Sequence, residues 1–234
     1  MKIRPDISLR FAFSCLALSL ILAISTLAGP PLICHPIDIG SAQSLPWPSD
    51  GRNLVGRPDY DVSQLVADTL SMLSPDMPVL VRMETLRRAT IYAQRDPQVA
   101  KQLLLRLHAR SEANVGDPLA AFDFGYLVEC YKQAQLAHSQ GLRAWGNGNW
   151  SNPAANVDGL AFVKAAIGMR GQDSEMEFAA ALIASERSRK DCQEHIDRAA
   201  IGVKDDPLLA QNLAGYFGKE TVSAALAKAS SGEK

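Results

Sequence analysis

The chain has 234 residues, of which 47% are hydrophobic and 21% charged, and its 24 Lys and Arg side chains nearly balance 25 Asp and Glu side chains. A net charge of −1 argues against a nucleic-acid partner and against binding to an anionic membrane surface, since both need a basic surface. The length is sufficient for one sizeable hydrophobic core or for a run of stacked modules.

Residues 1–28 have the form of a secretory signal peptide, with three basic residues before and at the start of an apolar run over residues 11–27. We expect cleavage after Ala28 and export to the periplasm, the cell envelope or the extracellular space. An uncleaved membrane anchor is the alternative, because the apolar run is about long enough to span a bilayer. The rest of the sequence contains no second run of that kind, so contact with a membrane is expected only through this segment.

Residues 29–60 predict an extended, proline-rich arm. This stretch contains six prolines and shows no helical period, and proline both fixes its own backbone and removes an amide donor. Its apolar residues, among them Leu32, Ile33, Ile37 and Trp47, indicate that the arm lies along the rest of the protein, since a free tail would be more polar.

From Asp61 onward the pattern is helical. Apolar residues recur three and four positions apart in three successive stretches, around Met83, Leu104 and Tyr126. The pairs Asp96–Pro97, Asp117–Pro118 and Asp206–Pro207 each predict a helix start, because a carboxylate caps the first turn and proline is tolerated at its first position. An all-α fold is expected.

An internal repeat appears in the second half. The sequence Ala-Ala-Ile-Gly at residues 165–168 returns at residues 199–202, an offset of 34 residues. In both copies a helix with a small-residue face precedes a polar turn, around Asp173 and Asp206, and then an alanine-rich helix. Small residues stand where neighbouring helices would approach closely, at Ala179, Ala180, Ala214 and Gly215.

This period and these positions resemble the tetratricopeptide repeat, over about two units within residues 157–230. The resemblance implies stacked antiparallel helical hairpins, in which each hairpin buries its apolar face against the next. Upstream of residue 157 the helices do not keep the 34-residue register, so we expect a diverged stack. The expected organisation is a signal peptide (1–28), an arm (29–60), a helical-repeat domain (61–230) with a loop at 145–156, and a short tail (231–234).

The loop at 145–156 contains four asparagines, two glycines and a proline, a composition that predicts a protruding loop. Trp145 and Trp150 bracket it, and Asn149 begins a glycosylation-type Asn-Trp-Ser triplet. With Trp47 of the arm, these residues are candidates for binding a peptide or another protein. The alternative is that the two loop tryptophans pin the loop onto its own domain.

Cys34 and His35 are the candidate catalytic pair. A nucleophilic thiol needs a base that generates the thiolate, but adjacent residues of an extended segment point to opposite sides. A structural disulfide from Cys34 to Cys130 or to Cys192 is therefore the competing expectation, since a bond of this kind would tether an arm without regular structure. Cys130 and Cys192 also fit the apolar faces of their helices as small buried side chains.

The sequence contains no nucleotide-binding loop, no serine elbow and no metal-ligand pair, so we expect neither a metal nor another cofactor. The carboxylates Glu175, Glu177, Glu186, Asp205 and Asp206 could serve acid–base chemistry, but their positions at helix starts fit interaction with helix dipoles equally well. The expected function is binding or scaffolding of another protein or peptide, rather than catalysis. A thiol-dependent enzyme or redox protein that uses Cys34 is the alternative.

Overall fold

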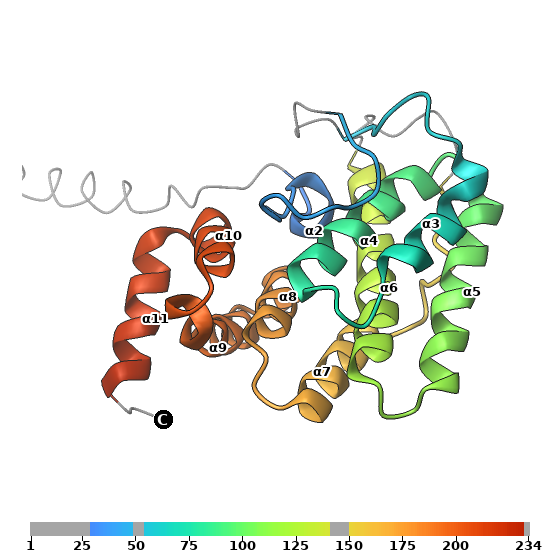
Figure 1. Ribbon diagram of the computed structural model, residues 1–234. Coiled ribbons are helices and arrows are strands. Elements are labelled where there is room, and N and C mark those ends of the chain that lie inside the picture. The colour runs from blue at the N-terminus through green and yellow to red at the C-terminus, as the bar shows by residue number, and fades with distance from the viewer. Residues whose placement is uncertain (1–28, 49–53, 141–149, 232–234) are drawn as a thin grey trace, which may run out of the picture.

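The computed structural model describes residues 29–48, 54–140 and 150–231, and all regular secondary structure among these residues is helical (Figure 1). The all-α prediction is confirmed for this part of the chain. In chain order the helices are α2 (Pro31–Cys34), η1 (Val62–Gln64), α3 (Leu65–Met72), α4 (Val79–Ala93), α5 (Pro97–Ala113), α6 (Pro118–Ser139), α7 (Gly159–Arg170), α8 (Ser174–Ser185), α9 (Arg189–Ala199), η3 (Ala200–Lys204), α10 (Pro207–Phe217) and α11 (Lys219–Ser231).

The three predicted Asp-Pro helix starts are confirmed. The side chains of Asp96, Asp117 and Asp206 accept hydrogen bonds from backbone amides in the first turns of α5, α6 and α10, and each is followed by proline. Asp173 caps α8 in the same way, with Oδ1 2.9 Å from the amide nitrogen of Met176. Local chemistry therefore determines where these helices begin.

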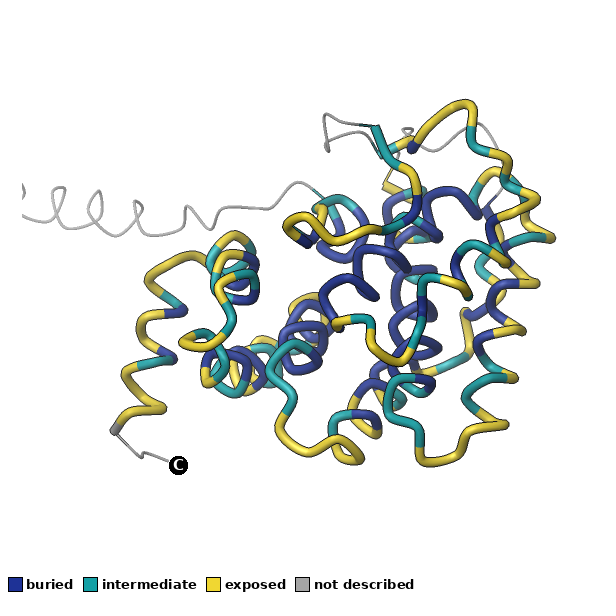
Figure 2. The backbone as a smooth tube through the Cα atoms, viewed as in Figure 1, coloured by how far each residue is buried: buried dark blue, intermediate teal, exposed yellow. Residues whose placement is uncertain are grey.

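Helices α4, α6 and α8 form the centre of the molecule, and Figure 2 shows the buried backbone concentrated along them. Helix α6 contacts α4, α5 and α7, whereas α8 contacts α4, α7, α9 and α10. Even charged side chains of α4 and α6 are enclosed: Arg82 Nη1 lies 2.6 Å from Asp123 Oδ2, and both side chains are fully buried. A buried pair of this kind is tolerated because each charge neutralises the other.

Helices that follow one another along the chain contact each other through most of the molecule, with η3 as the link between α9 and α10. Helices α6 and α7 approach each other closely at two glycines. A Cβ atom added to Gly125 would lie 2.6 Å from the carbonyl oxygen of Gly159, and one added to Gly159 would lie 2.4 Å from the carbonyl oxygen of Gly125. Only glycine allows this approach.

The structure confirms some of the small residues expected at helix contacts and contradicts one of them. Ala179 and Ala180 are fully buried as expected, but Gly215 is exposed, and a Cβ atom there would meet nothing within 4 Å. The close helix approach expected at Gly215 is thus wrong, because the glycine faces away from the neighbouring helices. The expected arm includes one helical turn, α2, while residues 35–48 contain no helix or strand.

The expected signal peptide at 1–28 lies outside the described residues, as do Trp145 and Asn149. Within residues 29–48, 54–140 and 150–231, no helix combines the length and the apolar character needed to cross a bilayer.

Candidate functional site

The N-terminal segment, defined here as residues 29–48, lies against the helices, and side chains from α4, α6 and α10 bind its main chain. Three backbone amides of the segment donate to side-chain oxygens of these helices: Leu32 N to Gln133 Oε1 (2.7 Å), Ile37 N to Glu84 Oε2 (3.0 Å), and Asp38 N to Asn212 Oδ1 (2.8 Å). The segment forms no strand, so these side chains take the place of the partners that a sheet or helix would provide.

Five carbonyl oxygens of the same segment accept hydrogen bonds from side chains of the body. The donors and acceptors are Arg87 Nη1 to Ile33 (3.0 Å), Tyr216 OH to His35 (2.7 Å), Asn212 Nδ2 to Asp38 (2.8 Å), Arg88 Nη1 to Leu45 (2.7 Å), and Tyr92 OH to Pro46 (2.5 Å). We call Glu84, Arg87, Arg88, Tyr92, Gln133, Asn212 and Tyr216 the segment-binding site.

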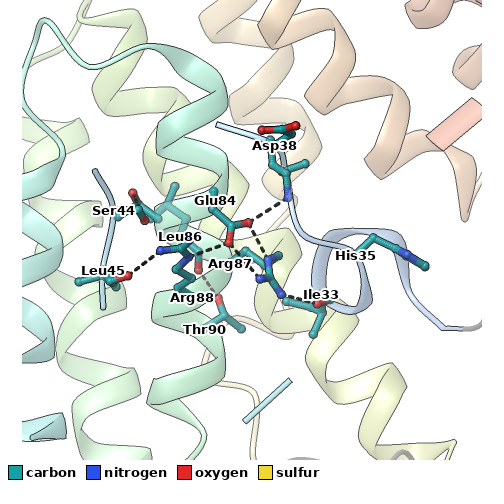
Figure 3. A network of polar contacts seen from close by, with 12 residues as sticks. Ile33, His35, Asp38, Ser44, Leu45, Glu84, Leu86, Arg87, Arg88 and Thr90 are labelled. Carbon is teal, nitrogen blue, oxygen red and sulfur yellow. Dashed lines mark hydrogen bonds and ion pairs between the residues drawn. The ribbon is translucent and has the colours of Figure 1, made fainter. Parts of the chain in front are cut away.

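A cluster of three charges on α4 forms the centre of this site (Figure 3). The carboxylate of Glu84 accepts hydrogen bonds from Arg87 Nε (2.7 Å), Arg87 Nη2 (3.0 Å) and Arg88 Nε (2.7 Å), as well as from the amide of Ile37. Glu84 and Arg87 are each 1% exposed. While Glu84 holds each guanidinium, Nη1 of that guanidinium donates to a carbonyl of the N-terminal segment, of Ile33 for Arg87 and of Leu45 for Arg88.

Helix α10 provides the other side of the site. The amide of Asn212 binds both the N–H and the carbonyl of Asp38, and Gln211 Nε2 donates to the Asp38 carboxylate at 2.6 Å. An asparagine that binds both polar groups of one residue recognises the main chain independently of the side chain at that position. Tyr216 adds its hydroxyl, and its ring meets His35 edge-on at 5.8 Å.

Apolar side chains of the segment complete the contact. Leu32, Ile33, Ile37 and Leu45 are each at most 3% exposed and belong to the hydrophobic core of the molecule. Full burial of one such side chain stabilises the folded state by about 1.5–3 kcal/mol. The segment is therefore held by apolar burial at a few positions and by main-chain hydrogen bonds between them.

Cys34 and His35 lie within the segment, but their environment does not favour thiol chemistry. Burial raises the pKa of the Cys34 thiol to about 11, although the positive charge of Arg87 acts in the opposite direction. Burial and Arg87 both lower the pKa of His35. The thiolate is the reactive form of cysteine, so a raised pKa makes Cys34 a poor nucleophile near neutral pH.

The three cysteines of the described residues, Cys34, Cys130 and Cys192, are all free. The expected disulfide from Cys34 to Cys130 or Cys192 is therefore wrong for this structure. Cys130 is fully buried in the core, and burial raises its pKa far above the ordinary value. Hydrogen bonds and apolar burial hold the N-terminal segment in place of the expected covalent tether.

Two of the tryptophans named as binding candidates, Trp47 and Trp150, have structural contacts. The ring of Trp47 lies beside the guanidinium groups of Arg87 and Arg88, at 5.1 and 5.6 Å, and meets Tyr92 edge-on. Trp150 is 7% exposed and packs edge-on against Tyr131, which agrees with the alternative that it anchors its loop. Trp47 therefore belongs to the contact between the segment and α4.

The residues of the segment-binding site were not identified from sequence. Glu84 precedes Arg87 by three positions and Arg88 by four, a spacing that predicts only an ordinary ion pair on a helix surface. The one available signal was that α4 is apolar on several sides, which indicates a buried helix and hence buried charges. Searches against protein-family models, curated proteins and solved structures find no match to this chain.

Proposed function

We propose that this chain is an exported helical-repeat protein that binds an extended segment of another protein or peptide in the cell envelope. The observation that carries the proposal is the segment-binding site: side chains of α4 and α10 bind the main chain of residues 35–48, which have no regular structure, and Gln133 of α6 binds the amide of Leu32 just before them. A site built this way suits recognition of polypeptide in general, since every peptide offers the same main-chain groups.

The N-terminal segment then acts as a ligand supplied by the chain itself. Its sequence indicates what a competing partner must offer: two adjacent apolar residues in the places of Leu32 and Ile33, and a third four positions later in the place of Ile37. Covalent attachment gives the segment an effective concentration of about millimolar. A partner must therefore be abundant, bind more tightly, or meet the site when the segment has been released.

The resemblance of residues 157–230 to tetratricopeptide repeats supports a scaffolding role by analogy, and the signal-like residues 1–28 support export. The described helices agree with a stack of this kind, because α8 contacts α7, α9 and α10 in turn. We do not extend the proposal to a thiol-dependent activity, because burial of Cys34 disfavours its thiolate.

Exchange of the segment tests the proposal. A protease recognition sequence is inserted between residues 48 and 54 of the full chain, the chain is cut, and a fluorescent peptide of residues 29–48 is added. We expect the peptide to exchange into the site, with a rise in anisotropy that unlabelled peptide reverses. A matched peptide with Leu32→Asp and Ile33→Asp is expected not to compete.

The opposite outcome of the peptide-exchange experiment would refute the proposal. If the cut protein keeps its helical circular dichroism but neither retains its own segment on gel filtration nor takes up the labelled peptide, the segment is not a separable ligand and the proposal fails.

A further inference from the structure

A hollow of about 270 Å³ lies where the N-terminal segment meets α10. Its walls come from two elements that are far apart in the sequence: the segment contributes His35 and Asp38, and α10 contributes Gln211, Gly215 and Tyr216. No lysine or arginine is among the residues that line it. Because both elements are needed to form the hollow, a molecule that fills it binds the protein only while the segment lies on α10.

The carboxylate of Asp38 is held in a fixed orientation at this hollow. Its Oδ1 accepts a hydrogen bond from the amide of Gly40 at 2.9 Å, and its Oδ2 accepts one from Nε2 of Gln211 at 2.6 Å. Both donors are neutral, and the carboxylate forms no ion pair in the part of the chain that the structure describes. Since a carboxylate has about four lone-pair sites, Asp38 offers a positioned negative charge that can accept further hydrogen bonds.

The neighbouring ring groups also suit a positive ligand. The side chain of His35 points away from the charged cluster on α4 (Figure 3), and its Nε2 is buried without a hydrogen-bond partner among the described residues. Burial and the charge of Arg87 lower the pKa of His35, so near neutral pH the imidazole is uncharged and keeps one nitrogen as an acceptor. The ring of Tyr216 lies edge-on to it, and an aromatic face attracts cations.

Gly215 keeps the hollow open. It lies within α10, where glycine weakens a helix relative to other residues. Its φ is not positive, and a Cβ atom added to it would meet nothing within 4 Å. Neither the backbone conformation nor the packing of the described helices therefore requires glycine at this position, whereas a longer side chain would enter the hollow.

We propose that this hollow binds an alkylammonium group, carried by a lysine side chain or by a free amine, and that the bound group locks the N-terminal segment onto α10. An ammonium has three donors, and the hollow offers the carboxylate of Asp38, the imidazole of His35 and the amide oxygen of Gln211. A divalent metal ion needs more oxygen ligands than one carboxylate provides.

The lock follows from mass action. A ligand that binds only the arrangement with the segment in place stabilises that arrangement by a factor that grows with ligand concentration. The regulatory meaning of the lock rests on the proposed function, because a partner can occupy the α10 side of the segment-binding site only after the segment has left it. Binding of the ammonium group itself needs no partner.

An NMR titration of the full chain, followed at the backbone amides of Asp38 and Gly215, tests the binding. The probes are butylammonium chloride and Nα-acetyl-lysine amide. Nα-acetyl-norleucine amide is the matched probe without the ammonium group, and calcium chloride tests a metal ion. We expect saturable shifts with a Kd on the order of 1 mM for an ammonium probe. Tighter binding of the lysine probe assigns the site to a polypeptide side chain, and tighter binding of butylammonium assigns it to a free amine.

Matched variants locate the binding. Gly215→Leu should abolish it, because the leucine side chain fills the hollow. Gly168→Leu, at another exposed helical glycine with open space around it, should bind as the wild type does. Asp38→Asn keeps the main chain that Asn212 holds and should weaken binding by at least about tenfold, through loss of a charge-assisted hydrogen bond.

Three results would overturn the site. They are no saturable shift at about 50 mM of either ammonium probe, equally tight binding of the norleucine probe or of calcium, and wild-type affinity in Gly215→Leu.

Hydrogen exchange over residues 32–38 of the full chain tests the lock. Butylammonium at about ten times its Kd should slow exchange of these amides about tenfold, and it should leave their exchange in Gly215→Leu unchanged. Unchanged exchange in the wild type with the probe bound would overturn the lock. Peptide exchange into the cut protein without any amine decides the proposed function separately.

Discussion

Replacement of Glu84 by glutamine should destabilise the protein more than any surface substitution. The carboxylate accepts four hydrogen bonds, from the amide of Ile37, from two nitrogens of Arg87 and from one nitrogen of Arg88. Glutamine keeps the shape but removes the charge and turns one acceptor into a donor that faces other donors. Arg87, which is 1% exposed, then remains as a buried charge without its counterion.

Breaking a buried ion pair costs about 3–5 kcal/mol. The lower end applies here, because Arg88 is 17% exposed and can recover part of its hydration. A loss of about 3 kcal/mol is large against a total stability of about 5–15 kcal/mol. With a urea dependence of about 3 kcal/mol per molar, the unfolding midpoint should fall by about 1 M.

Urea unfolding followed by circular dichroism measures this shift. The exposed Glu186→Gln is the matched control and should stay within about 0.5 kcal/mol of the wild type. The double variant Glu84→Gln/Arg87→Met should be less destabilised than the sum of the single variants, because the uncompensated charge is gone. A midpoint for Glu84→Gln within 0.2 M of the wild type would refute the argument that this cluster is a buried charged network.

Three other results are expected. Asn212→Ala removes two hydrogen bonds to Asp38. It should weaken binding of the labelled peptide to the cut protein by about 2 kcal/mol, measured by anisotropy. The free energy of unfolding of the cut protein without peptide should change by less. Gly125→Ala should destabilise by at least about 1–3 kcal/mol, because the methyl group meets backbone at 2.6 Å; Gly168→Ala, in open space on an exposed helix surface, should instead stabilise by up to about 1 kcal/mol. Alkylation of Cys34 at pH 8 should be slow in the intact protein, since its pKa is raised to about 11, and should accelerate on unfolding. Equal rates in native and denatured protein would contradict that assignment.

The sequence by itself determined where several helices begin. An aspartate followed by proline acts on amides two or three residues away, so Asp96, Asp117 and Asp206 could be recognised as caps without knowledge of the fold. The apolar periods around Met83 and Tyr126 likewise predicted two of the central helices, because helical periodicity is also a local property.

Tertiary structure decided the candidate site. Glu84 meets the amide of Ile37 across 47 residues, Arg87 meets the carbonyl of Ile33 across 54, and Asn212 meets Asp38 across 174. The local sequence does not indicate which groups these side chains bind, because their partners are backbone groups that every residue carries. For the same reason the expected disulfide could not be judged from sequence: whether Cys34 reaches another thiol depends on where the N-terminal segment lies.

The carboxylate of Glu175 also combines a local role, which the sequence indicates, with surroundings that only the fold provides. Glu175 stands at the start of α8, where a helix dipole favours any acidic side chain, and the sequence indicated only that local role. The fold adds the first turn of α4 to its surroundings and places Asp206 at the pocket that Glu175 lines. Burial and the nearby charges of Asp206 and Asp173 raise the pKa of the carboxyl, whereas the Leu80 amide lowers it. Local chemistry thus determined the helices, whereas the charges that act on one another were brought together only by packing.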